Sequence, residues 1–220
     1  VAGHQIVTVL NRSPLPSDLS ASVVGTPAEV ARSADMVITM LPDTPDVERV
    51  LFGNEGFLSG ITVGKLVIDM SSISPIATAS FAEKFREVGV GYLDAPVSGG
   101  EVGAKAASLT IMVGGSKDDF ARALPIFEKL GKNITLIGEN SGAGQICKIA
   151  NQIIVALNIE AVAEALADVV GLDDNVAEPL ARRDDDLELV LVDPRRLGLG
   201  LQLLVLGETS LALCLSCLGR

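Results

Sequence analysis

Short apolar runs rich in β-branched residues recur along the first two thirds of the chain, and they predict buried strands. These runs span residues 6–10, 36–41, 65–69, 91–94, 109–113 and 134–137. Between them lie stretches with helical spacing, at residues 26–33, 46–51, 74–88 and 118–130. The first of these has the signature of a helix start, with Thr26 as N-cap, Pro27 at the first helical position and Glu29 three residues after the cap.

Strands that alternate with helices at this spacing predict an α/β, Rossmann-like fold with a doubly wound, mostly parallel sheet. Such sheets bind ligands at the carboxyl ends of their strands. Four residues stand at or just past predicted strand ends: Arg12, Leu41, Ser71 and Asp94. Their shared placement indicates a binding site more strongly than any one of these residues does alone.

After these elements the pattern changes to one long helix over residues 141–170. Because its apolar residues occupy more than one face, we expect this helix to be buried between domains or subunits. The remaining residues are leucine-rich and match no regular domain pattern. The chain is therefore predicted to comprise a Rossmann-like domain at residues 1–139, an interdomain helix at 140–170 that begins a helical domain, and an irregular tail at 171–220.

Composition and charge exclude several classes of protein. A formal net charge of -11 disfavours nucleic-acid binding, which needs a concentrated basic surface. The three cysteines, Cys147, Cys214 and Cys217, have no disulfide-framework spacing, so we expect a reducing, cytoplasmic environment. The apolar stretch at 197–218 is interrupted by Gln202 and Glu208, and we expect no membrane partner.

Lys148 is the strongest candidate for a catalytic residue. Its neighbours, including Cys147 and Ile149, look interior, and a lysine among them calls for an explanation. Burial lowers a lysine pKa and suits the side chain to proton transfer or to holding negative charge on a carbonyl oxygen. Asn151, three residues on, shares its helix face and could bind substrate. The alternative is an ordinary surface lysine.

Two further segments could bind anions. Ser98, Gly99 and Gly100 follow a predicted strand, and their backbone N–H groups could hold a carboxylate, although a plain turn has the same composition. Asn11 and Arg12 follow the first run, where an arginine would accommodate the 2′-phosphate of NADP in a dinucleotide-binding fold. Here too a solvent-exposed loop is the alternative. With one histidine in the chain, a histidine-dependent triad or a metal site is not expected.

Six segments in series resemble the β-hydroxyacid dehydrogenases, a family that includes 3-hydroxyisobutyrate dehydrogenases and tartronate semialdehyde (2-hydroxy-3-oxopropionate) reductases. The segments, which lie in order within residues 1–167, read VTVLNRSP, ADMVITMLPD, GKLVIDMSSISP, DAPVSGGEVGA, LTIMVGG and GAGQICKIANQ. The resemblance implies NADP(H)- or NAD(H)-linked interconversion of a small 3-hydroxy acid and its semialdehyde. The segments NRSP and MSSISP are more similar to the sequences of the reductases than to those of the 3-hydroxyisobutyrate dehydrogenases. Asn151, where 6-phosphogluconate dehydrogenases have histidine, argues against a sugar phosphate.

The resemblance also implies roles for matching residues. Lys148 would donate a proton to the carbonyl oxygen. The substrate carboxylate would be held by residues already singled out: Ser98, Gly99, Gly100 and Asn151. The cofactor would be bound by Asn11, Arg12, Leu41, Pro42 and Ser72.

Two departures from the family pattern leave another class of function open. The family's first strand and its G-x-G-x-x-G phosphate loop would precede this chain, so the Rossmann-like domain is expected to be N-terminally truncated. The leucine-rich tail replaces the family's helical domain. The alternatives are therefore an inactive binding module, or an interaction protein that uses the tail. In the full-length family we expect a homo-oligomer.

Overall fold

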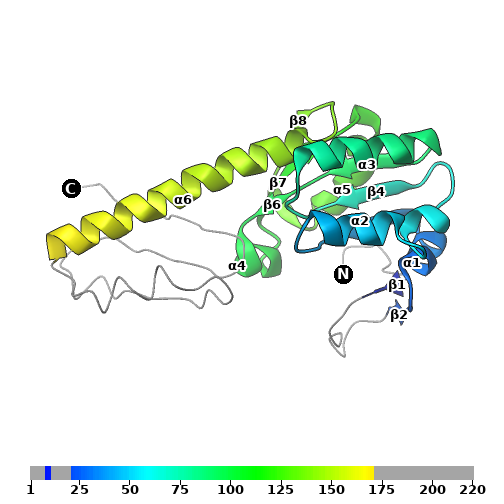
Figure 1. Cartoon of the computed structure of the whole chain (residues 1–220), viewed down its shortest axis with the longest axis horizontal. Coiled ribbons are helices and arrows are strands. Elements are labelled where there is room, and N and C mark those ends of the chain that lie inside the picture. The colour runs from blue at the N-terminus through cyan, green and yellow to red at the C-terminus, as the bar shows by residue number, and fades with distance from the viewer. Residues whose placement is uncertain (1–7, 11–20, 171–220) are drawn as a thin grey trace. The chain divides into compact units, whose positions relative to one another are not determined.

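The structure, a computed structural model, describes residues 8–10 and 21–170, with side chains described as far as residue 165. The strands are β1 (Thr8–Val9), β2 (Ser22–Val23), β3 (Met36–Thr39), β4 (Leu66–Asp69), β5 (Gly91–Asp94), β6 (Val97–Ser98), β7 (Leu109–Gly114) and β8 (Gly131–Gly138). The helices are α1 (Pro27–Ser33), α2 (Thr44–Phe52), α3 (Pro75–Glu87), α4 (Gly100–Lys105), α5 (Lys117–Phe127) and α6 (Ala143–Val170), with a 3-10 turn, η1, at Phe57–Ser59 (Figure 1).

The described strands form a six-stranded sheet in the order β3-β4-β5-β7-β6, with β8 paired to β7, and a separate two-stranded sheet of β1 and β2. Strands β3, β4 and β5 are parallel, which confirms the Rossmann-like prediction at the part of the sheet that carries the candidate site. Strand β7 pairs with β5 in the antiparallel direction, so the sheet is mixed. Sequence pattern misses this because a strand's apolar residues do not encode its direction.

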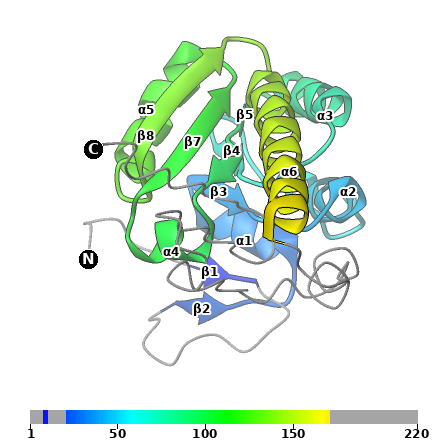
Figure 2. The same ribbon diagram turned by 90° about the vertical axis from the view of Figure 1, so that its left-hand side faces the viewer.

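Helices cover both faces of the sheet. Helices α1, α2 and α3 lie over one face and α5 over the other (Figures 1 and 2). Successive residues of a strand point to opposite faces, so Val67 and Tyr92 belong to the core beneath α2 and α3, whereas their neighbours on β4 and β5 face the other layer. Burial on both sides explains why the runs read as continuously apolar.

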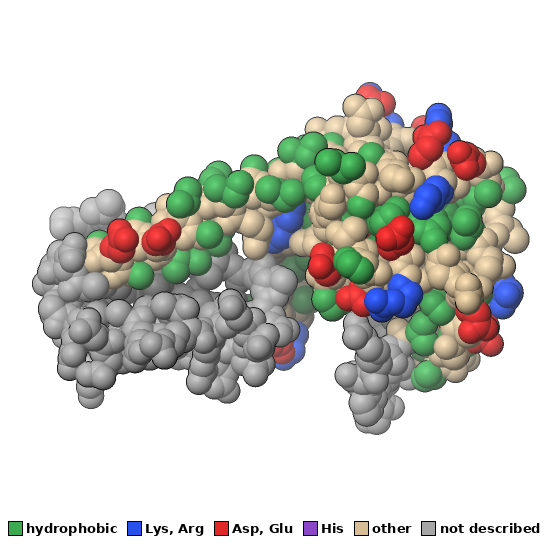
Figure 3. All heavy atoms as spheres, in the orientation of Figure 1, with side chains coloured by type: hydrophobic (Ala, Val, Ile, Leu, Met, Phe, Trp, Pro, Cys, Tyr) green, Lys and Arg blue, Asp and Glu red, His purple; other side chains and the backbone are tan. Residues whose placement is uncertain are grey.

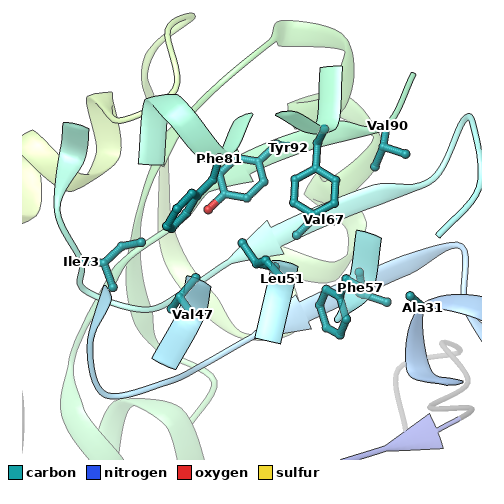
Figure 4. Packing of buried hydrophobic residues seen from close by; sticks show 11 residues of the cluster. Ala31, Val47, Leu51, Phe57, Val67, Ile73, Phe81, Val90 and Tyr92 are labelled. Carbon is teal, nitrogen blue, oxygen red and sulfur yellow. The ribbon is translucent and has the colours of Figure 1, made fainter. Parts of the chain in front are cut away.

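Aromatic rings from α2, α3 and β5 fill the core on the α2–α3 side. Phe85 is fully buried and stacks on Tyr92 with ring centroids 5.8 Å apart, and Phe52 lies 5.2 Å from Phe81. Leu51 and the side chains around it close the space between α2 and the sheet (Figure 4). This packing fixes the positions of β4 and β5, whose carboxyl ends carry the site.

Local signals placed the helix starts well. Thr26 accepts from the backbone of Glu29, and the Glu29 carboxylate accepts from the Thr26 backbone, which is the predicted capping box. Ser74 caps α3 through the backbone N–H of Ala77. The sequence pattern did not predict β2, β6, α4 or the 3-10 turn, because segments this short contain too few apolar residues to show a period.

The chain divides into two compact units. The first comprises Val1–Val97 and Thr110–Lys148, and the second comprises Ser98–Leu109 and Ile149–Arg220. Lys148 is thus the last residue of the first unit, and α6 continues into the second. The division predicted from sequence at residues 139/140 and 170/171 stays a prediction.

Large apolar side chains of α6 are exposed within this chain, and their expected burial between domains or subunits stays a prediction. Between 44% and 62% of the surface of each of five large residues is exposed: Ile146, Ile149, Ile153, Ile154 and Leu157. Figure 3 shows hydrophobic side chains at the surface along α6. By length and composition alone, Ala143–Ala165 could also cross a membrane, which is weak evidence because helices of soluble proteins have the same properties.

Candidate functional site

Three polar side chains meet where the parallel strands end. Thr39, Asp69 and Asp94 occupy paired positions on β3, β4 and β5, and all three are buried. The Thr39 hydroxyl donates to Asp69 Oδ1 at 2.8 Å. Carboxyl ends of parallel strands are where ligands bind in open α/β sheets, so these residues mark the relevant edge.

Asp69 organises the loops that follow β3 and β4. Its Oδ1 also accepts from the Ser71 backbone N–H at 3.1 Å, and its Oδ2 accepts from the Tyr92 hydroxyl at 3.4 Å. The Ser71 hydroxyl in turn accepts from the backbone N–H of Leu41 at 2.9 Å. Burial raises the pKa of Asp69, although hydrogen bonds from Ser71, Thr39 and Tyr92 oppose the shift.

Asp94 holds the start of α6 at the end of β5. Its Oδ1 accepts from the Gly142 backbone N–H at 2.7 Å, and its Oδ2 accepts from the Gln145 backbone N–H at 2.9 Å. The first N–H groups of a helix have no partner within the helix, and a carboxylate there also favours the helix dipole. Burial raises the pKa of Asp94, and these two N–H groups oppose the rise. A cap from a strand about fifty residues away fixes α6 against the sheet.

The helix approaches the sheet closely because Gly144 has no side chain. A Cβ at this position would lie 2.3 Å from the Met112 carbonyl oxygen and 2.9 Å from Asp94 Oδ2. Any other residue would therefore push α6 away from β5 and β7. This glycine therefore determines how close the next turn of the helix lies to the sheet.

Lys148 lies on that next turn and is only 2% exposed. Burial lowers the pKa of its ammonium group. Its burial confirms what the neighbouring residues predicted. A lysine whose charged form is destabilised gives up its proton more readily near neutral pH than a surface lysine.

Gln145 was not singled out from the sequence, although it is as buried as Lys148. Its Nε2 donates to the Ser71 carbonyl at 2.8 Å, and its Oε1 accepts from the Ile73 backbone N–H at 3.0 Å. The available signal was an amide one turn before the lysine in an otherwise apolar stretch. For Asp94 the sequence signal is its place at the end of a predicted strand.

The predicted cofactor residues divide into two groups. Leu41 is half-buried, and Pro42 and Ser72 are exposed, in the loops that follow β3 and β4 in the same unit as Lys148. Asn11 and Arg12 lie outside the described residues. Since Leu41 N–H bonds to Ser71 and proline has no N–H, this loop offers carbonyl oxygens and apolar surface, to which Met40 adds an exposed side chain. Such a surface fits the flat ring system of a dinucleotide.

The predicted substrate residues all lie in the second unit. Ser98 ends β6, and Gly99 and Gly100 begin α4 with φ angles of 133° and 58°. These left-handed conformations favour glycine, so the pair is required by the strand-to-helix turn itself. Asn151 is half-buried, and its amide donates to Gln152 Oε1 at 3.4 Å. A substrate-binding role for these four residues stays a prediction.

Comparison with known proteins agrees with this architecture. The sequence profile of one family, the NAD binding domain of 6-phosphogluconate dehydrogenase, matches residues 2–138. The 2-hydroxy-3-oxopropionate reductase of Escherichia coli is 55% identical over 169 residues, which are 75% of this chain and 57% of that protein. The chain belongs to this family of NAD-binding domains and, within it, to the β-hydroxyacid dehydrogenases.

Solved structures show the same relationship. A 3-hydroxyisobutyrate dehydrogenase of Mycobacterium tuberculosis, solved with L-serine, is 37% identical with a TM-score of 0.63, over 70% of this chain and 52% of that one. Psf3, solved with NADP+ and 2-OPP, is 26% identical with a TM-score of 0.65, over 72% of this chain and 57% of that one. The chain thus spans little more than half the length of these relatives.

Proposed function

We propose that the protein catalyses the reversible, NADP(H)-linked interconversion of a small 3-hydroxy acid and its semialdehyde. The observation that carries the proposal is the burial of Lys148 in the helix whose start is held by Asp94 at the carboxyl end of β5. Nucleotides bind at this edge in NAD-binding domains. The lowered pKa of Lys148 suits a group that gives and takes a proton during turnover.

Reduction of the semialdehyde to the hydroxy acid requires one hydride and one proton, and the protein would supply the proton. A nicotinamide cofactor, when bound, would supply the hydride that reduces the carbonyl carbon of the semialdehyde. Lys148 Nζ donates a proton to the carbonyl oxygen as negative charge develops there, and the product is a hydroxyl group. In the oxidative direction neutral Lys148 removes that proton. The loops of Leu41 and Ser72 would hold the cofactor.

The proposed substrate is tartronate semialdehyde, reduced to glycerate. The 55% identity to 2-hydroxy-3-oxopropionate reductase supports this choice. Its carboxylate would bind at Ser98, Gly99, Gly100 and Asn151. The structurally similar 3-hydroxyisobutyrate dehydrogenase makes 3-hydroxyisobutyrate the alternative substrate. Arg12 supports NADP over NAD, because its charge would suit a 2′-phosphate.

A cofactor titration followed by turnover tests the proposal. NADPH is titrated against the purified chain by calorimetry, and tartronate semialdehyde and methylmalonate semialdehyde are then compared as substrates through the loss of NADPH absorbance. The Lys148→Met variant should lose roughly a hundredfold or more in kcat while its Kd for NADPH stays close to that of the wild type. The exposed Lys129→Met is the matched control and should retain full kcat. Failure to bind NADPH would contradict the proposal and favour an inactive module.

A further inference from the structure

The side chain of Gln145 bridges two points on one loop. It donates to the Ser71 carbonyl and accepts from the Ile73 N–H, on either side of the exposed Ser72. A carbonyl can only accept and an N–H can only donate, so the two partners fix which way the amide is turned. With 1% of its surface exposed, Gln145 has little space for another arrangement.

This bridge links the helix of Lys148 to both loops assigned to the cofactor. Gln145 precedes Lys148 by one turn of α6, and residues three apart are neighbours on a helix. Ser71, at the other end of the bridge, accepts from the Leu41 N–H through its hydroxyl. Ser71 therefore connects the loop after β3, through its hydroxyl, to the turn of α6 just before the lysine, through its carbonyl.

The attachment of α6 to the sheet does not depend on Gln145 alone. Asp94 binds two backbone N–H groups of the helix start, and Gly144 allows the close approach. Loss of the Gln145 side chain would leave these contacts in place. What would change is the position of Lys148 relative to the loop that carries Ser72.

We propose that Gln145 is a positioning residue that sets the distance between the Lys148 ammonium and the cofactor bound at the Ser71–Ile73 loop. The inference rests on the proposed dehydrogenase function. Proton and hydride must reach the same carbonyl group, so an error of about 1 Å between their donors can cost roughly a hundredfold in rate. The residue would act through Lys148 and the loop, without touching substrate.

A Gln145 variant and a control elsewhere in the core distinguish a positioning role from a general loss of folding stability. Gln145→Met keeps the length of the side chain but removes both hydrogen bonds, and kcat should fall roughly tenfold to a hundredfold while KM for the semialdehyde changes little. Phe127→Leu, a fully buried change on α5, is the control for lost stability and should keep wild-type kcat below its melting temperature. Hydrogen exchange at residues 71–73 should accelerate in Gln145→Met and not in Phe127→Leu.

Gln145→Glu adds a readout that a purely structural role would not give. Ionised glutamate can accept from Ile73 but faces the Ser71 carbonyl without a proton, whereas protonated glutamate can donate to it as the amide does. The kcat of this variant, divided by that of the wild type at each pH, should therefore rise as pH falls. Other ionisable groups near this position are Asp94, which accepts from the Gln145 N–H, Asp69 with its partner Tyr92, and Lys148 one turn on. Dividing by the wild-type kcat reduces their contribution to the pH profile.

The outcomes distinguish the two proposals. A wild-type protein that binds NADPH and turns over substrate, with unchanged kcat in Gln145→Met, overturns the positioning role alone. A flat kcat ratio for Gln145→Glu across pH also overturns it. A wild-type protein with no turnover of either semialdehyde overturns the proposed function and the positioning role together.

Discussion

The backbone N–H of Gln145 donates to the carboxylate of Asp94 at 2.9 Å, across 51 residues of sequence. This bond joins the end of β5 to the first turn of α6. It makes a strand residue the cap of the helix that presents the candidate proton donor, and four predictions follow from this arrangement and the groups around it.

Asp94→Ala should destabilise the protein by roughly 2–4 kcal/mol, because it leaves the buried N–H groups of Gly142 and Gln145 without their charged acceptor. Asp94→Asn, which retains one acceptor oxygen, should lose less. Urea unfolding followed by circular dichroism measures both. Asp118→Ala, an exposed carboxylate in the first turn of α5, is the control, and an equal loss there would refute the special role of Asp94.

Gly144→Ala should cost roughly 1–3 kcal/mol or more, because the new methyl group would overlap the Met112 carbonyl oxygen and displace α6. Gly138→Ala is the matched control, since its Cβ would meet only the Ala143 side chain at 3.1 Å. Thermal unfolding of the two variants should differ clearly. Equal melting temperatures would show that α6 tolerates a wider separation from the sheet.

Asp69→Asn should become more stable relative to the wild type as pH rises. Burial raises the pKa of Asp69 in the folded protein, so its protonated form is favoured there. The resulting stabilisation is fully present below the ordinary aspartate pKa of about 3.9 and is lost as pH rises through the folded value. Asparagine keeps an acceptor for Thr39 and Ser71 but cannot ionise.

The measurement for Asp69 is the free energy of unfolding of both proteins from acid to neutral pH. Asp94, whose pKa is also raised, titrates in both proteins, so its contribution largely cancels in the difference. A difference that does not change with pH would contradict a raised pKa for Asp69.

The kcat for semialdehyde reduction should fall as pH rises through the pKa of Lys148, which burial places below the ordinary lysine value of about 10.4. Only the protonated lysine can donate. Lys148→Arg should lose most of its activity and this pH dependence, since a guanidinium stays charged. An arginine variant with the wild-type rate and profile would exclude proton donation by Lys148, and Lys129→Arg serves as the unaffected control.

Much of the secondary structure could be read from local sequence. The capping box at Thr26 and the proline at the start of α3 act within a single turn, so their signal is complete in a few residues. The burial of Lys148 could be inferred from its apolar neighbours. The exposure of α6 in this chain could not be inferred. An apolar pattern predicts that a helix face is buried, but it does not identify the segment or partner that buries it.

The sequence by itself determined the alternation of strands and helices, the caps and the lysine in an apolar helix, since each depends on residues within a turn or a strand of one another. Only the tertiary structure decided the antiparallel direction of β7 and the partners of Asp94 and Gln145. Those partners lie 48 to 74 residues apart in the sequence. A buried carboxylate or amide takes whichever donor or acceptor the packed sheet brings within reach, and no local pattern specifies which one that is.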